Sequence, residues 1–503
     1  MMLFVVYIAL LISLGLSLPD AFTDPASHKF IFLIGVLGIW RYSWGGLHFL
    51  RSILYRKFVF PRWRRLSSRA DSGSKADQIY LLLTTFRIGT ETTIEVYREA
   101  IREAIRCQKN VTLVVSIVEM ADQKLIKSIF LALQPPSRVR LHFVRIPGTG
   151  KRDALAHGFR AIARMQPSEN ALVAVIDGDS ILTRDSINLC ADLFSTRPQL
   201  GALTTDEECE VHGDTFVDGL YRRWYSMRFA QRHILMSSMG LARRVLTLTG
   251  RMSMFRASIV IQPAFVQTVQ DDYIDHWRLG RFRFLTGDDK SSWYHLLKNG
   301  WEMSYVPDVK IITVEEPPNA NFFAGATALM VRWFGNMLRT NSRASKIPRS
   351  VVGSFTWWAL RDQRLSMWTS LVGPTMVIQG VFMYGIDIFV VYVFWIGFTR
   401  LIQALMLLSA RPSISASYPF FLYFNQVYGS LVKVYVLCHL SRQKWTRQKT
   451  VLKTGKSQFQ ARLNHAMSNL VLASYMLIFF VAVGWLTGLF RYQDVYQLLS
   501  RMV

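Results

Sequence analysis

The sequence predicts an α/β domain with a mixed, mainly parallel sheet, embedded between α-helical membrane segments. The chain has 503 residues, of which 51% are hydrophobic, and its mean hydropathy is +0.20, which is too apolar for an ordinary soluble protein of this size. Apolar stretches of spanning length flank residues 77–318, which contain none. Inside that region, short β-rich runs alternate with amphipathic segments, a pattern typical of a sheet covered by helices.

The first 50 residues predict two membrane helices. Residues 2–18 and 30–50 each approach the ~20 apolar residues that a spanning helix needs. A cleaved signal is disfavoured, because no basic region precedes the first stretch and no small-residue cleavage site follows it. Residues 51–76 are strongly basic, and positive charge beside a span indicates the cytosolic side, so we expect an interfacial linker there.

The central region predicts the sheet, and the C-terminal part predicts further membrane segments. Strands are expected at residues 78–85, 111–118, 139–146 and 172–176, with a helix over 93–106. A crossing by residues 418–440 would place the following basic segment outside, so this stretch is predicted to lie at the cytosolic interface, giving five spans in all. The expected order is a cytosolic domain over 77–320, surface helices over 321–366, two spans in 367–410, an interfacial helix and basic loop in 411–465, a last span in 466–490 and a periplasmic tail over 491–503.

The net charge of +25 is compatible with nucleic acid, anionic lipid or an anionic substrate as partner. Many Lys and Arg residues crowd beside the apolar segments, which favours a lipid bilayer. No recognition motif for nucleic acid is present, so we expect no nucleic-acid partner. The four cysteines have no metal-ligand spacing and are predicted to be reduced and structural; they are Cys107, Cys190, Cys209 and Cys438.

Two acidic pairs are candidates for chemistry. Asp177 and Asp179 directly follow a predicted buried strand, where ligands bind in open α/β sheets. The pair could hold a divalent cation against a diphosphate, or it could form an ordinary Asx turn. Asp288 and Asp289 precede an amphipathic helix, where they could supply a general base or merely cap the helix.

Arg332 and Trp333 form a third candidate on a predicted surface helix. Trp can stack on a sugar ring and Arg can bind phosphate through two hydrogen bonds. The alternative is an interface anchor, since both residues are common beside a bilayer.

The order of these motifs resembles that of the processive inverting glycosyltransferases of family 2, which include cellulose, chitin and hyaluronan synthases. Two further segments fit that family: GKRDALAHG at residues 150–158 resembles its GKxxALxxG motif, and GWEMSYVPD at 300–308 resembles its GWxxxYVPD motif. The resemblance covers essentially the whole chain and implies a GT-A type glycosyltransferase domain with a Rossmann-like sheet. Three positions depart from the pattern: Leu329 replaces a usual Gln, Glu119 lacks the usual DDxS setting, and the base motif reads TGDD.

With these departures, the sequence is similar to the catalytic subunits of bacterial alginate polymerases. This resemblance implies GDP-mannuronate as donor, a β-1,4-polymannuronate chain as product, and translocation across the bacterial inner membrane. Residues after the last predicted span are too few for a cyclic-di-GMP-sensing domain, so we expect a separate membrane co-polymerase and an export complex as partners. Two alternatives stay open: a polysaccharide synthase that uses a UDP-sugar, and a non-catalytic export scaffold.

The family resemblance also implies a role for each candidate residue. Asp289 would be the catalytic base, with Asp288 supporting it, and Mg²⁺ (or Mn²⁺) would be the cofactor. The Glu119 carboxylate could accept hydrogen bonds from the edge of the guanine base, or it could simply lie at the surface. The basic loop could be a gating loop or a plain cytosolic loop. The implied sets are Asp177 and Asp179 for the metal, Thr85, Glu119, Lys151, Asp177 and Arg332 for the donor, Trp333 and Arg251 for the acceptor and channel, and Trp445, Thr446 and Arg447 for the gating loop.

Overall fold

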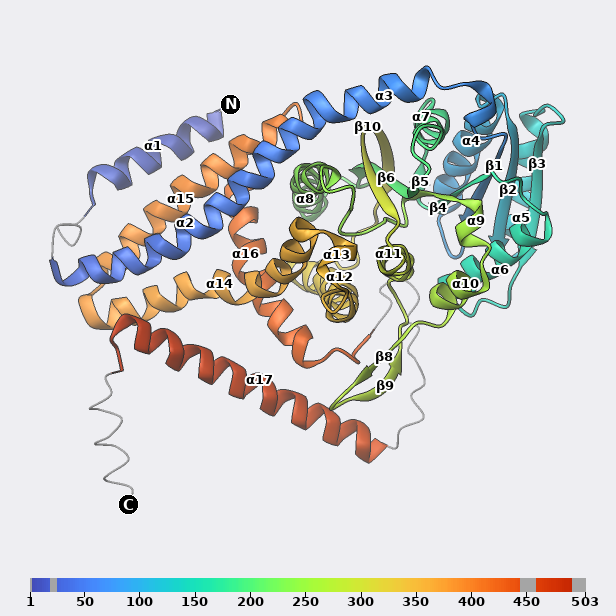
Figure 1. The fold of residues 1–503 in the computed structure, drawn as a ribbon. Coiled ribbons are helices and arrows are strands. Elements are labelled where there is room, and N and C mark those ends of the chain that lie inside the picture. Colours follow the sequence, from blue (N-terminus) through green and yellow to red (C-terminus); the bar gives the residue numbers. More distant parts are fainter. Residues whose placement is uncertain (1, 19–24, 444–457, 491–503) are drawn as a thin grey trace.

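The computed structural model describes residues 2–18, 25–443 and 458–490, and it contains an eight-stranded mixed sheet, most of which lies toward the right in Figure 1. The strands β3, β2, β1 and β4 pair in parallel in that order, and β10 pairs in parallel with β6. The strand β7 lies between β4 and β6 and is antiparallel to both. The strands predicted from the sequence are confirmed as β1 to β4. In spatial order, the strands are β3 (Val139–Arg145), β2 (Asn110–Ile117), β1 (Gln78–Thr84), β4 (Leu172–Asp177), β7 (Met252–Arg256), β6 (Leu200–Glu210), β10 (Glu302–Val314) and β5 (Ser180–Ile181).

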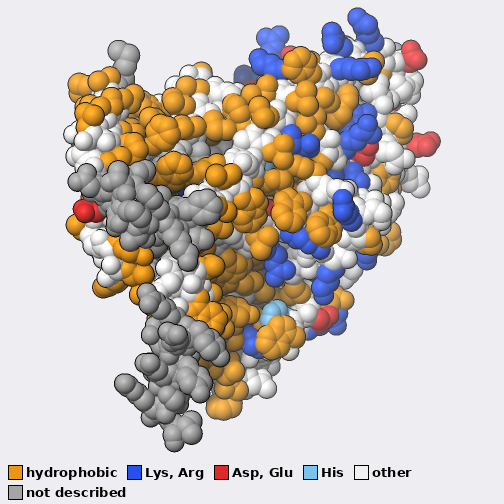
Figure 2. All heavy atoms as spheres, turned by 60° about the vertical axis from the view of Figure 1, so that its left-hand side comes forward, with side chains coloured by type: hydrophobic (Ala, Val, Ile, Leu, Met, Phe, Trp, Pro, Cys, Tyr) orange, Lys and Arg blue, Asp and Glu red, His pale blue; other side chains and the backbone are white. Residues whose placement is uncertain are grey.

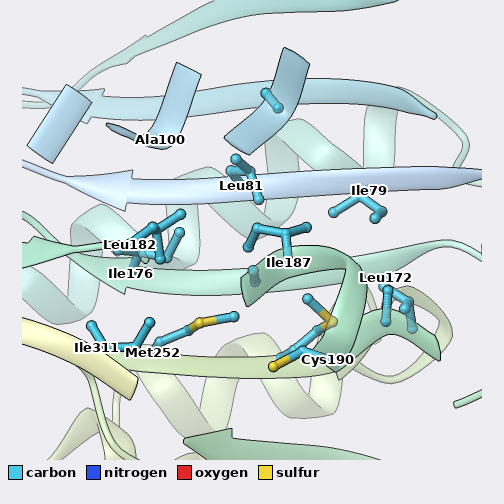
Figure 3. Packing of buried hydrophobic residues seen from close by; sticks show 14 of the residues in the cluster. Ile79, Leu81, Ala100, Leu172, Ile176, Leu182, Ile187, Cys190, Met252 and Ile311 are labelled. Atoms are coloured by element: carbon cyan, nitrogen blue, oxygen red, sulfur yellow. The ribbon is translucent and has the colours of Figure 1, made fainter. Parts of the chain in front are cut away.

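Helices cover both faces of this sheet, because alternate side chains of each strand point to opposite sides. On one face, Ile79 and Leu81 of β1 pack against α4 (Thr90–Arg106), α5 (Met120–Ala132) and α7 (Ser186–Asp192) (Figure 3). On the other, Tyr80 and Leu82 pack with α6 (Lys151–Arg164), α10 (Pro263–Gln270) and α11 (Asp288–Lys298). Two buried apolar layers therefore hold the strands rigidly. The short helix α9 (Ala257–Val260) lies on the same face, whereas a hairpin of β8 (Tyr273–His276) and β9 (Gly280–Arg283) packs with α8 (Phe216–Gly240), α12 (Phe322–Ala344) and α16 (Tyr418–Cys438).

The remaining helices form a bundle on the other side of the molecule (Figure 1). Asp387–Ser409 and Gln458–Thr487 are long and apolar enough to cross a membrane, and Met2–Leu16 is a shorter apolar helix. Figure 2 shows hydrophobic side chains gathered over this bundle, with Lys and Arg concentrated toward the sheet side. The bundle and its connecting helices are α1 (Met2–Leu16), α2 (Pro25–Leu54), α3 (Phe60–Ser68), α8 (Phe216–Gly240), α12 (Phe322–Ala344), α13 (Arg349–Val352), α14 (Ser354–Tyr384), α15 (Asp387–Met406), α16 (Tyr418–Cys438) and α17 (Gln458–Thr487).

Helix α14 differs from the prediction of a surface helix followed by a separate span. It is one continuous helix of 31 residues, with Pro374 inside it. Its first turns belong to the core of the sheet domain, where Ala359 and Leu360 are buried with residues of α6 and α11. Packing against the sheet domain stabilises those turns as a helix, so they continue directly into the apolar half of α14.

The predicted linker over residues 51–76 is mostly helical and docks onto the protein. A π-helical turn, Tyr55–Val59, joins α2 to α3. Tyr55 is fully buried and donates its hydroxyl to the carbonyl of Tyr305, 2.6 Å away. Arg64 binds Asp308 with two nitrogens at 2.7 and 2.9 Å. Part of the basic charge in this segment therefore binds protein groups.

A buried ion pair joins the sheet to the segment after α15. Arg411 donates to both carboxylate oxygens of Asp206 at 2.9 and 3.0 Å, and both side chains are buried. Tyr305 also donates to Asp206, and His233 lies 3.1 Å from it. Burial alone would raise the pKa of Asp206, but His233 and Arg411 hold it well below its usual range. The carboxylate is therefore ionised and needs its partners.

We predict that Arg411→Ala destabilises the chain by about 3–5 kcal/mol, because it leaves a buried carboxylate without its cation. Thermal unfolding of the full chain in detergent checks this, as a lower Tm. Arg184→Ala is the control, since the Arg184 side chain is 83% exposed and the side chain of its partner Asp185 is 51% exposed. Equal Tm values for the two variants would contradict the role given to Arg411.

Candidate active site

A cleft of about 490 Å³ opens at the carboxyl ends of β1 and β4. Its walls come from the start of α6, the loop before β7, the start of α11 and one face of α12. Sheet edges of this kind are the usual ligand sites of α/β folds. Of the residues predicted from the sequence, the cleft is lined by Thr85, Lys151, Asp177, Asp179, Arg251, Asp288, Asp289, Arg332 and Trp333.

The first acidic pair is placed by a buried strand and a tight turn. Asp177 is the last residue of β4 and lies opposite Thr84 of β1. Gly178 passes so close to β1 that a Cβ there would lie 2.4 Å from the Thr84 carbonyl oxygen. Only glycine permits this approach, and the turn it allows brings both Asp177 and Asp179 into the cleft. The turn and the ligand-binding interpretation are thus compatible.

Lys151 connects the two acidic pairs. It is the first residue of α6, after Gly150 with φ of 128°. Its ammonium lies 2.5 Å from Asp177 Oδ1 and 3.1 Å from Asp288 Oδ2. Burial would lower the pKa of Lys151, but these two carboxylates raise it, so the ammonium is charged. A Cβ on Gly250 would lie 2.7 Å from both Lys151 Nζ and Asp177 Oδ2, so a side chain at this position would have to displace that ion pair.

The second acidic pair begins α11 after Gly287, whose φ is 88°. Burial acts to raise the pKa of both carboxyls. For Asp288, Lys151 and Arg152 overcome that effect, and its pKa is lowered. For Asp289, the adjacent Asp288 charge adds to burial, and its pKa is raised. The environments therefore shift the pKa of Asp288 down and the pKa of Asp289 up, the arrangement expected of a general base and its support.

The predicted acceptor residues lie at one end of the cleft. Trp333 packs 5.7 Å from the ring of Trp224, and the Arg228 guanidinium lies 4.3 Å from its ring centre. Arg251 is bound to Glu207 at 3.0 Å and to Glu315 at 2.7 Å. Two carboxylates thus already engage the Arg251 guanidinium, so its first role here is to hold that wall of the cleft.

Some predicted residues are not brought into this group. Glu119 is exposed at the start of α5 and does not line the cleft, although the neighbouring Val118 does. The predicted gating residues Trp445, Thr446 and Arg447 lie outside the described residues.

Several residues of the site carried no recognisable signal in the sequence. Arg152 is buried behind α11 and donates to the carbonyls of Val269 and Thr286 at 2.6 and 3.0 Å. Asn336 accepts the Thr286 hydroxyl at 2.7 Å, one helical turn after Trp333. Arg152 follows Lys151 at a variable position of the GKxxALxxG motif, so the motif itself does not single it out.

The residues present fit a divalent cation shared with a substrate. Across the described residues, no group of three or more His, Cys, Asp or Glu side chains could enclose a metal ion. Asp177 and Asp179 are nevertheless oxygen ligands facing an open cleft, and Mg²⁺ commonly uses one or two carboxylates plus substrate phosphates and water. Thr85 is 97% buried at the cleft wall, and its hydroxyl has no hydrogen-bond partner among the described residues, which also indicates a ligand there.

The mixed sheet, with an acidic turn after β4 and an acidic pair opening α11, defines a GT-A type glycosyltransferase. Residues 76–336 match the family described as Glycosyltransferase like family 2. The chain is 48% identical to the Glycosyltransferase alg8 of Pseudomonas syringae pv. tomato over 91% of this chain and 92% of the relative. It is 47% identical to the Glycosyltransferase alg8 of Azotobacter vinelandii, over 94% of this chain and 95% of the relative.

The chain therefore belongs to the family 2 glycosyltransferases, as its motifs predicted, and it is an enzyme of that class. Among solved structures, the mannosyltransferase PcManGT from Pyrobaculum calidifontis, in complex with GDP-Man and Mn²⁺, shares 15% identity and a TM-score of 0.47. The match covers 81% of this chain and 98% of that one.

We predict that Gly178→Ala lowers sugar transfer by about 100-fold or more, because its methyl group must push Asp177 and Asp179 away from β1 and small displacements of positioned groups cost such factors. Initial rates of nucleotide release measure this. Gly73→Ala is the matched control, since nothing lies within 4 Å of a Cβ at that exposed position. A Gly178→Ala enzyme with the control's rate would show that the close approach is dispensable.

Proposed function

We propose that the chain polymerises mannuronate from GDP-mannuronate into β-1,4-polymannuronate by inverting transfer, and carries the polymer across the inner membrane. The strongest support comes from two features of one cleft. The pKa of Asp289 is raised, as a general base requires, and Lys151 connects the acidic turn after β4 to the acidic pair that begins α11. The name alg8 on two relatives that align over nine-tenths of the chain supports the alginate assignment.

In this proposal the donor diphosphate lies over the turn after β4. Asp177 and Asp179 hold a divalent cation, Mg²⁺ or Mn²⁺, which neutralises charge on the leaving nucleotide when it is bound. Lys151 and Arg332 add positive charge, and the buried Thr85 hydroxyl gains a hydrogen-bond partner in the donor. Together these groups lower the cost of releasing GDP.

Asp289 is the general base. It takes the proton from the acceptor hydroxyl as the oxygen attacks the anomeric carbon opposite the leaving diphosphate, so the configuration inverts in one displacement. Asp288 remains ionised through Lys151 and Arg152 and keeps the pKa of Asp289 above its ordinary value. No second carboxylate nucleophile is required, unlike in retaining sugar chemistry.

Trp333 provides an apolar face for the acceptor sugar between the cleft and the helices. The membrane assignment is supported by α15, α17 and the exposed apolar bundle surface. The proposal retains five spans, a cytosolic catalytic domain over 77–320, the gating role of Trp445, Thr446 and Arg447, and Glu119 as a guanine contact. A separate cyclic-di-GMP-binding co-polymerase and an export complex complete the proposed assembly.

We predict that Asp289→Asn lowers GDP release from GDP-mannuronate by about 10²–10⁴-fold, the usual contribution of a positioned base. Membranes containing the full chain, its proposed co-polymerase and Mg²⁺ are assayed for released GDP. Asp275→Asn is the control, because Asp275 lies on the exposed β8 hairpin with a 70% exposed side chain. If only a UDP-sugar were turned over, GDP-mannuronate would be wrong as the donor, although the fold assignment would stand. If Asp289→Asn released GDP at the control rate, Asp289 would not be the general base.

We predict that activity falls as the pH is lowered through the raised pKa of Asp289, because protonation removes the base. Asp288→Asn should move this acid limb to lower pH, since it removes the charge that helps to raise that pKa. The pH dependence of kcat/KM measures the shift independently of overall rate. An acid limb that stays in place or moves to higher pH would exclude Asp288 as the group that tunes Asp289.

A further inference from the structure

The turn between β8 and β9 presents a large aromatic side chain to the outside. Trp277 is 85% exposed, which makes it the most exposed tryptophan among the described residues. A single exposed apolar residue is common on protein surfaces, so the meaning of Trp277 depends on what surrounds it. Two properties distinguish this turn: it is braced from within, and it is fastened to helices of the bundle.

Hydrogen bonds to His276 brace the turn. Its Nδ1 accepts the backbone N–H groups of Arg278 and Leu279, both at 3.2 Å. Burial, and after it the Arg278 charge, lower the pKa of His276, so the imidazole is neutral at pH 7 and can accept these bonds. The His276 ring also stacks with the ring of Trp277, with 5.8 Å between their centres, while Leu279 is buried. The turn therefore holds Trp277 outward instead of letting it fold back onto the protein.

Arg278 fastens the same turn to two bundle helices. Its guanidinium donates to the Cys438 carbonyl at 2.7 Å and to the Ser468 hydroxyl at 2.8 Å. Cys438 is the last residue of α16, where a cation is favoured because the final carbonyls of a helix carry partial negative charge. Ser468 belongs to α17, which is long and apolar enough to cross a membrane. Figure 1 accordingly shows the hairpin beside the first half of α17.

The contact with α17 falls where the composition of this helix changes. Residues 458–469 read QFQARLNHAMSN and are largely polar. Residues 470–487 contain no charged residue, and as a helix they are about 27 Å long, close to the thickness of the hydrocarbon core of a bilayer. Side chains around the contact also lie open, since Leu463, Met467 and Leu470 are 42–59% exposed. Ser468 thus marks the level at which a spanning α17 enters hydrocarbon.

We infer that the β8–β9 turn is a membrane anchor, in which Trp277 lies in the lipid headgroup region beside the entry of α17. The inference rests on the proposed function, because it takes α17 as a span. Tryptophan favours this level of a bilayer, since its ring is apolar and its indole N–H can bind water or a headgroup. Lipid is the occupant that the site favours, because the turn is bound to a helix whose exposed apolar side chains already require hydrocarbon. Arg278 is engaged with α16 and α17, so the anchor depends on the indole and not on anionic lipid.

The test measures the depth of three positions of the full-length chain in nanodiscs of zwitterionic lipid. A fluorescent label is attached to Trp277→Cys, to Leu477→Cys in the apolar part of α17, or to Arg184→Cys on the sheet domain. Leu477 is 64% exposed and the Arg184 side chain is 83% exposed, so the label reaches both positions. Lipids that carry a nitroxide quencher at the headgroup or in mid-chain report the depth. The unsubstituted chain, treated with the same reagent, corrects for the four native cysteines.

Each label should respond to a different quencher. The label at Trp277→Cys should lose most fluorescence to the headgroup quencher, the label at Leu477→Cys to the mid-chain quencher, and the label at Arg184→Cys to neither. The native indole is followed by the fluorescence that Trp277→Phe removes, because the difference between the wild type and this variant isolates one of the 14 tryptophans. The headgroup quencher should reduce that difference more than the mid-chain quencher does.

The Leu477 label separates failure of the anchor from failure of the proposed span. If the Leu477 label lies in hydrocarbon but the Trp277 label is quenched only by iodide in the water, the anchor is wrong and the span stands. If the Leu477 label lies outside hydrocarbon, the span is wrong and the anchor with it. If the Trp277 label becomes protected only when the co-polymerase is added, a protein covers this turn, and the inference of a lipid contact is overturned.

Discussion

The ammonium of Lys151 holds the active site together. It connects the end of β4 to the start of α11, two segments more than 100 residues apart in the sequence, through ion pairs with Asp177 and Asp288. Without this charge, the carboxylates gathered at one sheet edge would repel one another and take up protons. With it, Asp288 stays ionised, while burial and the Asp288 charge raise the pKa of Asp289. In the proposed function, this single lysine allows donor binding and proton transfer to occupy the same cleft.

Much of this arrangement was predictable because it depends on local patterns. Short apolar runs rich in Val, Ile and Leu locate β1 to β4, and an acidic turn directly after β4 must lie at the sheet edge. Arg152, Trp224 and Arg228 could not be assigned in this way. In a helix, a charged or aromatic residue has the same local signal whether it faces water, lipid or an internal cavity, and only the packing of distant segments decides among them.

The same reason explains the two largest differences from the sequence prediction. The basic charges after α2 indicated a linker beside a bilayer, yet Arg64 binds Asp308 and Tyr55 is buried against β10. Trp and Arg residues before the third predicted span indicated a separate surface helix, but the turns they occupy are continuous with the apolar part of α14. In both cases, segments whose composition predicts a position at the membrane surface instead pack against the sheet domain.

The continuity of α14 has a consequence for how this enzyme could be processed. Its first turns complete the apolar core that also contains α6 and α11, and Trp44 of α2 packs against the same core. A protease that cut the chain just before α12 would therefore not release a soluble catalytic fragment. The severed domain would expose the apolar surface that α14 had covered and would tend to aggregate. Proteolysis at this point therefore cannot turn the protein into a soluble enzyme.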